Sequence, residues 1–137
     1  MKIAIIGAGA WGTALGRLLV LGGNEVTLWG HVPAWLDEMR QTHRNERFLP
    51  GIDLPRALHL ESDFDRAVRA TECVVVAVPS QVFRDVTRRL GDYSGLVVTV
   101  TKGIEYDTGL TMSGVLTETA PQATPVALSG PTFAVEV

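Results

Sequence analysis

Residues 2–12 decide the fold, and they read Lys2-Ile3-Ala4-Ile5-Ile6-Gly7-Ala8-Gly9-Ala10-Trp11-Gly12. The apolar residues 3–6 run without the alternation of a half-exposed strand. Such a run is typical of a strand that is buried on both faces of a parallel sheet. Apolar residues then recur at helical spacing after Gly12, at Ala14, Leu15, Leu18 and Leu19. The stretch therefore predicts a strand, a tight turn and a helix in immediate succession.

The three glycines of this turn have the spacing of a phosphate-binding loop. Gly7 allows a sharp turn out of the strand, Gly9 lets a pyrophosphate approach the backbone, and Gly12 lets the helix pack closely on the sheet. The first free N–H groups of the helix and the positive end of its dipole then face the phosphates. Because the glycines stand between an apolar strand and a helix, we favour dinucleotide binding over a glycine-rich turn without a ligand.

A second strand is expected over residues 25–29, which completes a βαβ unit within about 30 residues. The chain then reads Trp29-Gly30-His31-Val32. The Asp or Glu that commonly accepts hydrogen bonds from the adenosine ribose is absent at this point. Without this carboxylate, the site does not repel the 2′-phosphate of NADP, and NAD can still bind. The sequence therefore favours NADP, with NAD as the alternative, and places His31 beside the ribose or its 2′-phosphate.

Strands and helices continue to alternate along the rest of the chain. Further strands are expected over residues 58–60, 73–78, 96–100 and 125–128, a loop over residues 45–51, and a helix start with a capping box at Ser62 and Asp65. The prediction is one α/β domain over residues 1–137, with a doubly wound, mostly parallel Rossmann-type sheet of about six strands in a three-layer αβα arrangement. Ligands of such sheets bind outside the carboxyl ends of the strands. The glycine turn, Pro79-Ser80, Lys102 and residues 130–134 should meet there.

Composition narrows the function classes. The net charge of −3 argues against a nucleic-acid or anionic-membrane partner. The single cysteine, Cys73, stands in an apolar run and is expected to be a core residue. No stretch has spanning length or a signal-peptide pattern, so a cytoplasmic protein is expected. No metal site is predicted.

Several stretches together resemble one family, the NAD(P)-dependent glycerol-3-phosphate dehydrogenases of the soluble bacterial type, in their N-terminal domain. The stretches occur in order over nearly the whole chain: residues 7–15, Leu28-Trp29-Gly30-His31, Asn45 with Phe48-Leu49-Pro50-Gly51, Val78-Pro79-Ser80, Thr101-Lys102-Gly103-Ile104-Glu105 and Ser129-Gly130-Pro131-Thr132-Phe133-Ala134. The match of all of them is far more specific than the glycine spacing, which many dehydrogenases share.

The resemblance implies a role for individual positions. Cofactor contacts fall on Ala10, Trp11, His31, Lys102 and Ala134, in addition to Gly7, Gly9, Gly12 and Pro79 at the expected site. Substrate contacts fall on Lys102, Gly130 and Thr132. A cation such as Lys102 at the carboxyl end of a strand also suits this role chemically, because it can neutralise a phosphorylated substrate or polarise a carbonyl.

The implied reaction interconverts dihydroxyacetone phosphate and sn-glycerol 3-phosphate with NADPH or NADH, for glycerophospholipid synthesis. Family members have a second, helical domain that holds the catalytic lysine, and that domain is absent from these 137 residues. We therefore assign no catalytic residue here, and expect this chain to bind NADPH weakly and to turn over no substrate. The resemblance leaves a homodimer open for the full-length enzyme.

Two other functions stay open. The first is a related NAD(P)-dependent dehydrogenase that acts on a hydroxy acid or a sugar derivative, against which residues 102–105 and the Gly130 segment count. The second is a non-catalytic domain that senses a dinucleotide. The downstream coding sequence would separate this second alternative from an enzyme.

Overall fold

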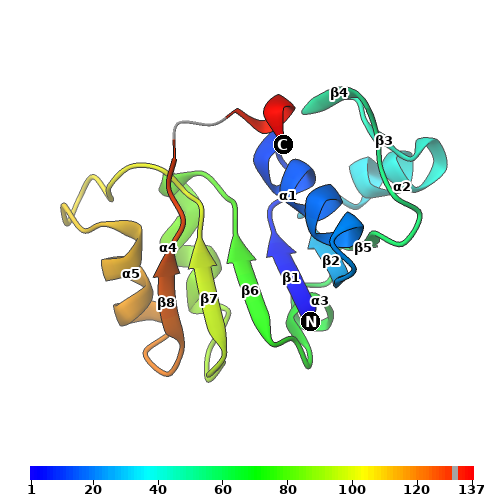
Figure 1. Cartoon of the computed structure of the whole chain (residues 1–137). Coiled ribbons are helices and arrows are strands. Elements are labelled where there is room, and N and C mark those ends of the chain that lie inside the picture. The colour runs from blue at the N-terminus through cyan, green and yellow to red at the C-terminus, as the bar shows by residue number, and fades with distance from the viewer. Residues whose placement is uncertain (131–132) are drawn as a thin grey trace.

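A six-stranded sheet forms the middle layer of the molecule (Figure 1). The computed structural model describes residues 1–130 and 133–137. The strands are β1 (Lys2–Ile6), β2 (Glu25–Trp29), β5 (His59–Glu61), β6 (Cys73–Val76), β7 (Leu96–Thr99) and β8 (Thr124–Ala127). Their order is β5-β2-β1-β6-β7-β8 and every neighbouring pair is parallel. This is the strand order of a doubly wound dinucleotide-binding sheet, so the predicted fold class is confirmed.

Helices cover both faces of this sheet. The helices are α1 (Ala10–Leu21), α2 (Pro33–Thr42), α3 (Phe64–Val68), α4 (Ser80–Arg88) and α5 (Met112–Thr119), and a short 3-10 helix, η1 (Ala134–Glu136), lies beside α1 (Figure 1). Ile3 and Ile5 pack in one core with α1 and α2, whereas Ala4 and Ile6 pack in a second core with α3, α4 and α5. The unbroken apolar run of β1 thus serves two cores, as its lack of alternation predicts.

The core on the α1 and α2 side is the less complete one. Val98 packs at its margin, and Val126 of β8 is the parallel partner of Val98. Leu96, two residues before Val98, lies on the same face because side chains alternate along a strand. Leu96 and Val126 each remain 40% exposed. One corner of the sheet therefore presents apolar side chains to solvent.

The expectation of a plain loop over residues 45–51 is wrong at its ends. β3 (Arg44–Asn45) and β4 (Leu49–Asp53) pair antiparallel as a separate two-stranded sheet, with Asn45 opposite Leu49. Both of these side chains are buried. The hairpin depends on these buried contacts, which a short segment rich in Pro and Gly does not reveal by periodicity.

The start of α3 also differs from its prediction by one residue. Asp63, and not Ser62, precedes the helix, and its Oδ1 accepts a hydrogen bond from the Arg66 N–H at 2.9 Å. Both side chains are good helix caps, so their local chemistry does not decide between them.

The structure describes residues 1–130 and 133–137, and two kinds of feature are absent from this part of the chain. No helix there has the length and hydropathy to cross a membrane. No group of three or more His, Cys, Asp or Glu side chains there is arranged to hold a metal ion. Cys73 is buried at the start of β6, and this burial raises the pKa of its thiol.

Candidate functional site

A cleft of about 430 Å³ opens where β1, β2 and β6 end. These strand ends lie at the arrowhead end of the sheet (Figure 1), where the strand order reverses between β1 and β6. Ligands of doubly wound sheets bind at this point. We call it the switch-point cleft, and it is lined by Gly7, Ala8, Gly9, Trp29, Gly30, His31, Val32, Trp35, Leu36, Met39, Asn45, Phe48, Ala77, Val78, Pro79, Val82 and Val86. The structure thus brings the glycine turn, His31 and Pro79 to one cavity.

The glycines of the turn have different roles. Gly7 has a φ of +119°, and a Cβ there would overlap the carbonyl oxygen of Ala77. A Cβ on Gly12 would overlap the carbonyl oxygen of Gly7. At Gly9, in contrast, a Cβ would meet nothing within 4 Å. The positive φ of Gly7 agrees with the sharp turn predicted there, and the lack of room at Gly12 agrees with its predicted close packing, whereas Gly9 borders the open space of the cleft.

The N-terminus of α1 has the features of an anion site. Thr13 is the first residue whose N–H closes a helical turn, onto the Gly9 carbonyl oxygen at 3.0 Å. No side chain caps the helix and its first turn contains no acidic residue. The N–H groups of residues 10–12 and a partial positive charge of about half a unit are therefore available to a ligand.

Asn45 joins the β3–β4 hairpin to the glycine turn. It is 4% exposed, and its Nδ2 donates hydrogen bonds to the Ala8 carbonyl oxygen at 3.0 Å and to Thr13 Oγ1 at 2.8 Å. Its Oδ1 accepts a hydrogen bond from the Phe48 N–H at 3.3 Å. Sequence reasoning placed Asn45 in a loop and assigned it no role in the site. The signal was a single amide residue three positions before an aromatic one.

An aromatic wall lines the cleft on the α2 side. The Trp35 ring lies between those of His31 and Phe48, at centroid distances of 6.0 Å and 5.7 Å. The Arg47 guanidinium carbon lies 4.6 Å from the Trp35 ring centroid, which is a cation–π contact. Among the described residues, no Asp or Glu lines the cleft. This wall can stack a planar ring and balance a negative charge beside it. The sequence predicted the position of His31 but not that of Trp35 or Arg47.

A second cavity, of about 310 Å³, adjoins the cleft along Ala77, Val78 and Pro79. We call it the Lys102 cavity, and it is lined by Ala10, Trp11, Ala77, Val78, Pro79, Ser80, Val100, Thr101, Lys102, Phe133 and Ala134. Of the segments predicted to meet here, the structure brings together Ala10 and Trp11 of the glycine turn, Pro79-Ser80, Lys102 and the end of residues 130–134 at Phe133 and Ala134. Gly130 is exposed beyond the end of β8 and does not line this cavity. Thr132 lies outside the described residues.

The loop that contains Lys102 is fixed at both ends. Thr101 Oγ1 donates a hydrogen bond to the Val78 carbonyl oxygen at 2.7 Å. Arg84 of α4 forms two hydrogen bonds of 2.7 Å to the carboxylate of Glu105, and a further 2.7 Å ion pair to Glu118 of α5. Hydrogen bonds from Arg84 and then from Thr108 lower the pKa of Glu105 to about 2. Hydrogen bonds to Glu105 and then to Glu118 raise the pKa of Arg84, so Arg84 and Glu105 are both ionised at neutral pH.

Comparisons with known proteins agree on one family. The family model described as NAD-dependent glycerol-3-phosphate dehydrogenase N-terminus matches residues 2–137. The chain is 42% identical over 143 residues to the glycerol-3-phosphate dehydrogenase [NAD(P)+] of Chlorobium phaeobacteroides strain BS1, a match that covers 100% of this chain and 43% of that protein.

Solved structures give the same result. The glycerol-3-phosphate dehydrogenase of Coxiella burnetii matches with a TM-score of 0.90 and 31% identity, over 98% of this chain and 42% of that one. The enzyme of Saccharomyces cerevisiae matches with a TM-score of 0.87 and 25% identity, over 99% of this chain and 43% of that one. The chain thus spans about two fifths of the length of the proteins it matches.

Proposed function

The chain belongs to the family of NAD-dependent glycerol-3-phosphate dehydrogenase N-terminal domains, and we propose that it binds the cofactor for the interconversion of dihydroxyacetone phosphate and sn-glycerol 3-phosphate. The observation that supports this most is the open N-terminus of α1 above a glycine turn, at the bottom of a cleft with an aromatic wall. When bound, the nicotinamide supplies or accepts the hydride. A role in glycerophospholipid synthesis in the cytoplasm belongs to the same proposal.

The switch-point cleft is proposed to bind the dinucleotide and the Lys102 cavity to bind the substrate. In the switch-point cleft, Gly9 and the first N–H groups of α1 hold the pyrophosphate, and the aromatic wall stacks the adenine. In the Lys102 cavity, the ammonium of Lys102 neutralises the phosphorylated substrate or polarises its carbonyl. Gly130 and Thr132 are proposed substrate contacts, and Ala134 a cofactor contact, on the family resemblance.

Catalysis is proposed to require a second domain. The proteins matched here are more than twice as long as this chain, which spans 43% of the Chlorobium enzyme. We expect the 137-residue chain to bind NADPH and to show no oxidation of NADPH that depends on dihydroxyacetone phosphate. Such turnover by the purified chain, measured at 340 nm, would contradict this part of the proposal.

A charge at Gly9 tests phosphate binding directly. Gly9 has an extended φ of −77° and free space around a Cβ, so Gly9→Asp is compatible with the fold. We expect at least about tenfold weaker NADPH binding, because like charges about 4 Å apart near a protein surface repel by several kcal/mol. Quenching of tryptophan fluorescence measures the affinity. Gly9→Asn is the uncharged control of equal size. Equal affinities of the Asp and Asn variants would argue against phosphate at this position.

The cofactor preference is proposed to be NADP over NAD. His31 and Arg47 flank Trp35 at the edge of the aromatic wall, and no carboxylate lines the cleft in residues 1–130 and 133–137. The Arg47 guanidinium on the Trp35 ring, next to the proposed ribose position, can pair with the 2′-phosphate of NADP. NAD has no 2′-phosphate for this guanidinium to bind.

Arg47→Gln tests this preference. We expect about tenfold weaker NADPH binding and a change of less than about twofold for NADH, because a single charge-assisted contact is lost. Arg66→Gln, an exposed change on α3, is the matched control. A loss of equal size for both cofactors would exclude a role for Arg47 in reading the 2′-phosphate.

A further inference from the structure

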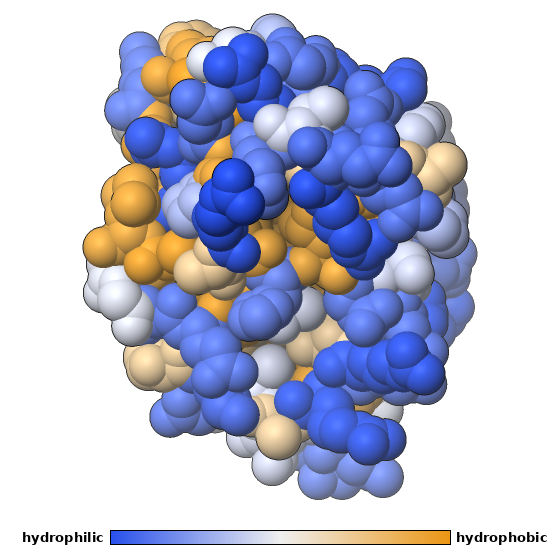
Figure 2. All heavy atoms as spheres, turned by 90° about the vertical axis from the view of Figure 1, so that its right-hand side faces the viewer, coloured by the Kyte–Doolittle hydropathy of each residue, from blue (hydrophilic) through white to orange (hydrophobic). Residues whose placement is uncertain are grey.

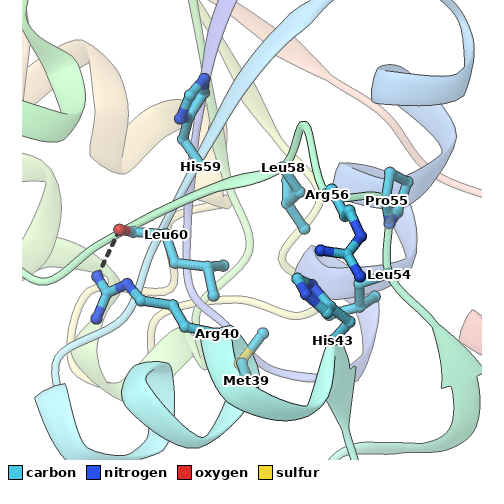
Figure 3. Close-up of a pocket in the computed structure, with 9 residues that line it drawn as sticks. All are labelled: Met39, Arg40, His43, Leu54, Pro55, Arg56, Leu58, His59 and Leu60. Carbon is cyan, nitrogen blue, oxygen red and sulfur yellow. Dashed lines mark hydrogen bonds between the residues drawn. The ribbon is translucent and has the colours of Figure 1, made fainter.

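A third cavity, of about 250 Å³, lies between the C-terminal half of α2 and the segment that leads from β4 into β5 (Figure 3). It is lined by Met39, Arg40, His43, Leu54, Pro55, Arg56, Leu58, His59 and Leu60. Among the described residues, Met39 alone also lines the switch-point cleft. We call this space the α2–β5 cavity. It is a separate site with its own chemistry.

Basic side chains surround an apolar floor in the α2–β5 cavity. Met39, Leu54 and Leu58 are nearly fully buried. The four polar side chains that line it are Arg40, His43, Arg56 and His59, and none of the described lining residues is acidic. Arg56 and His43 line the same cavity and their side chains point to the same part of it in Figure 3, whereas His59 points away from both. The face that holds this cavity shows small apolar areas between hydrophilic side chains (Figure 2).

Arg40 and Arg56 differ in how they are engaged. Arg40 donates to the Leu60 carbonyl oxygen at 2.6 Å and forms an ion pair with Asp37, so it connects α2 to β5 and shapes one wall. Arg56 has no ion pair and no side-chain hydrogen bond with the rest of the described chain. Its guanidinium therefore keeps all of its donors for a ligand.

The carboxylates closest in sequence to the cavity do not neutralise Arg56. Asp37 pairs with Arg40, and Asp53 accepts a 2.7 Å bond from Arg44. Glu61 accepts backbone N–H bonds from residues 62 and 63 at 2.8 and 2.9 Å. Glu38, which precedes Met39 in α2, forms no ion pair with Arg56 either, so no carboxylate of residues 1–130 and 133–137 pairs with this guanidinium.

We propose that the α2–β5 cavity binds a small anion of the phosphate type, with Arg56 and His43 as its direct ligands. A guanidinium fork matches two phosphate oxygens, and the imidazole donates to a third. The volume suffices for a phosphate group with a short organic substituent, which the apolar floor would contact. The site is independent of the dinucleotide proposal, because none of its polar residues lines the switch-point cleft.

The test is a titration of the chain with inorganic phosphate, followed by 1H–15N NMR, against chloride at matched ionic strength. We expect saturable shifts at residues 39–43 and 54–60 with phosphate only. Arg56→Gln should weaken the affinity at this site by about tenfold or more, because it removes a bidentate charge-assisted contact. His43→Asn should also weaken it, and Asn tolerates the left-handed backbone of His43, which has a φ of 53°.

Two comparisons keep the result specific. Arg66→Gln, which removes an exposed charge elsewhere, should leave the affinity unchanged. Shifts at residues 7–12 report phosphate at the α1 N-terminus and should persist in Arg56→Gln. The amide spectrum of each variant shows whether it is folded. Shifts at the cavity that chloride reproduces, or that Arg56→Gln leaves unchanged, would overturn the proposal.

Discussion

At the scale of single residues, Asn45 is a side chain that connects three parts of the proposed cofactor site. Its amide contacts the glycine turn at Ala8 and the first turn of α1 at Thr13, and accepts from Phe48 in the aromatic wall. These three partners lie on different elements. One buried side chain therefore sets the distance between the proposed phosphate and adenine positions.

Asn45→Ala should destabilise the fold and loosen this site. The substitution removes the donor to the buried Thr13 hydroxyl and to the half-buried Ala8 carbonyl oxygen, and a buried unsatisfied group costs about 1–3 kcal/mol. The exposed Phe48 N–H keeps its bond to the Asn45 carbonyl oxygen. We expect a loss of that size in the free energy of unfolding, measured by urea denaturation, together with weaker NADPH binding. Gln41→Ala, at an exposed position on α2, is the control. An unchanged free energy of unfolding would show that water replaces these hydrogen bonds.

At the scale of elements, Arg84 holds three segments together. It lies on α4, pairs with Glu105 in the Lys102 loop and pairs with Glu118 on α5. The Arg84 and Glu105 side chains are only 21% and 15% exposed, and their contact is bidentate. Geometry of this kind is more stabilising than a single exposed ion pair. The loop that presents Lys102 is thus fixed by charges outside the two cavities.

The contribution of Glu105 should depend on pH in a defined direction. Its pKa falls from an ordinary value of 4.5 to about 2 in the folded chain, because Arg84 and Thr108 donate to the carboxylate. A lowered pKa stabilises the fold above pH 4.5, and this stabilisation is lost as the pH falls toward 2.

Glu105→Gln checks this dependence. The variant should be less stable than the parent chain at pH 7, and the difference should shrink between pH 4.5 and pH 2. Urea midpoints across this range measure it. Asp107→Asn, at an exposed position of the same loop, should leave the profile unchanged. A constant difference across the whole range would show that Glu105 does not titrate as proposed.

At the scale of the whole molecule, the sheet is covered unevenly. Val126 and Leu96 are exposed on the α1 and α2 side, and β8 is an edge strand of the sheet, with no further strand paired to it among residues 1–130 and 133–137. Leu128 adds exposed apolar surface just beyond β8, at 53%. Such a corner favours contact with another protein surface.

The chain by itself should therefore self-associate through β8. Val126→Lys should weaken this association by about tenfold or more, equivalent to about 1.4 kcal/mol, because the contact would bury a charge. Sedimentation velocity over a range of concentrations measures it. Gln81→Lys adds the same charge at an exposed position on α4 and should have no effect. A monomer at all concentrations would contradict this prediction.

The sequence by itself determined the type of sheet and the glycine turn of the proposed cofactor site. An unbroken apolar run predicted that β1 is buried on both faces, and the glycine spacing predicted the sharp turn at Gly7 and the close packing of the helix at Gly12. These features depend on neighbours in the chain, since period, turn chemistry and backbone freedom are local properties. The alternation of strands and helices predicted a doubly wound sheet, and with it that Pro79, Lys102 and Ala134 meet at the carboxyl ends of its strands. The order of the strands came only from the structure.

Only the tertiary structure decided which side chains surround the glycine turn and the Lys102 loop. The β3–β4 hairpin, the place of Asn45, the contact of Arg47 with Trp35 and the bond network of Arg84 join residues whose partners are set by packing. Arg84 and Glu105 are 21 residues apart, and Asn45 and Ala8 are 37 apart. No local pattern encodes such pairs, because their geometry exists only after the helices have docked on the sheet. The physical reason is that side-chain partners depend on packing in three dimensions, whereas strands and turns depend on the chain itself.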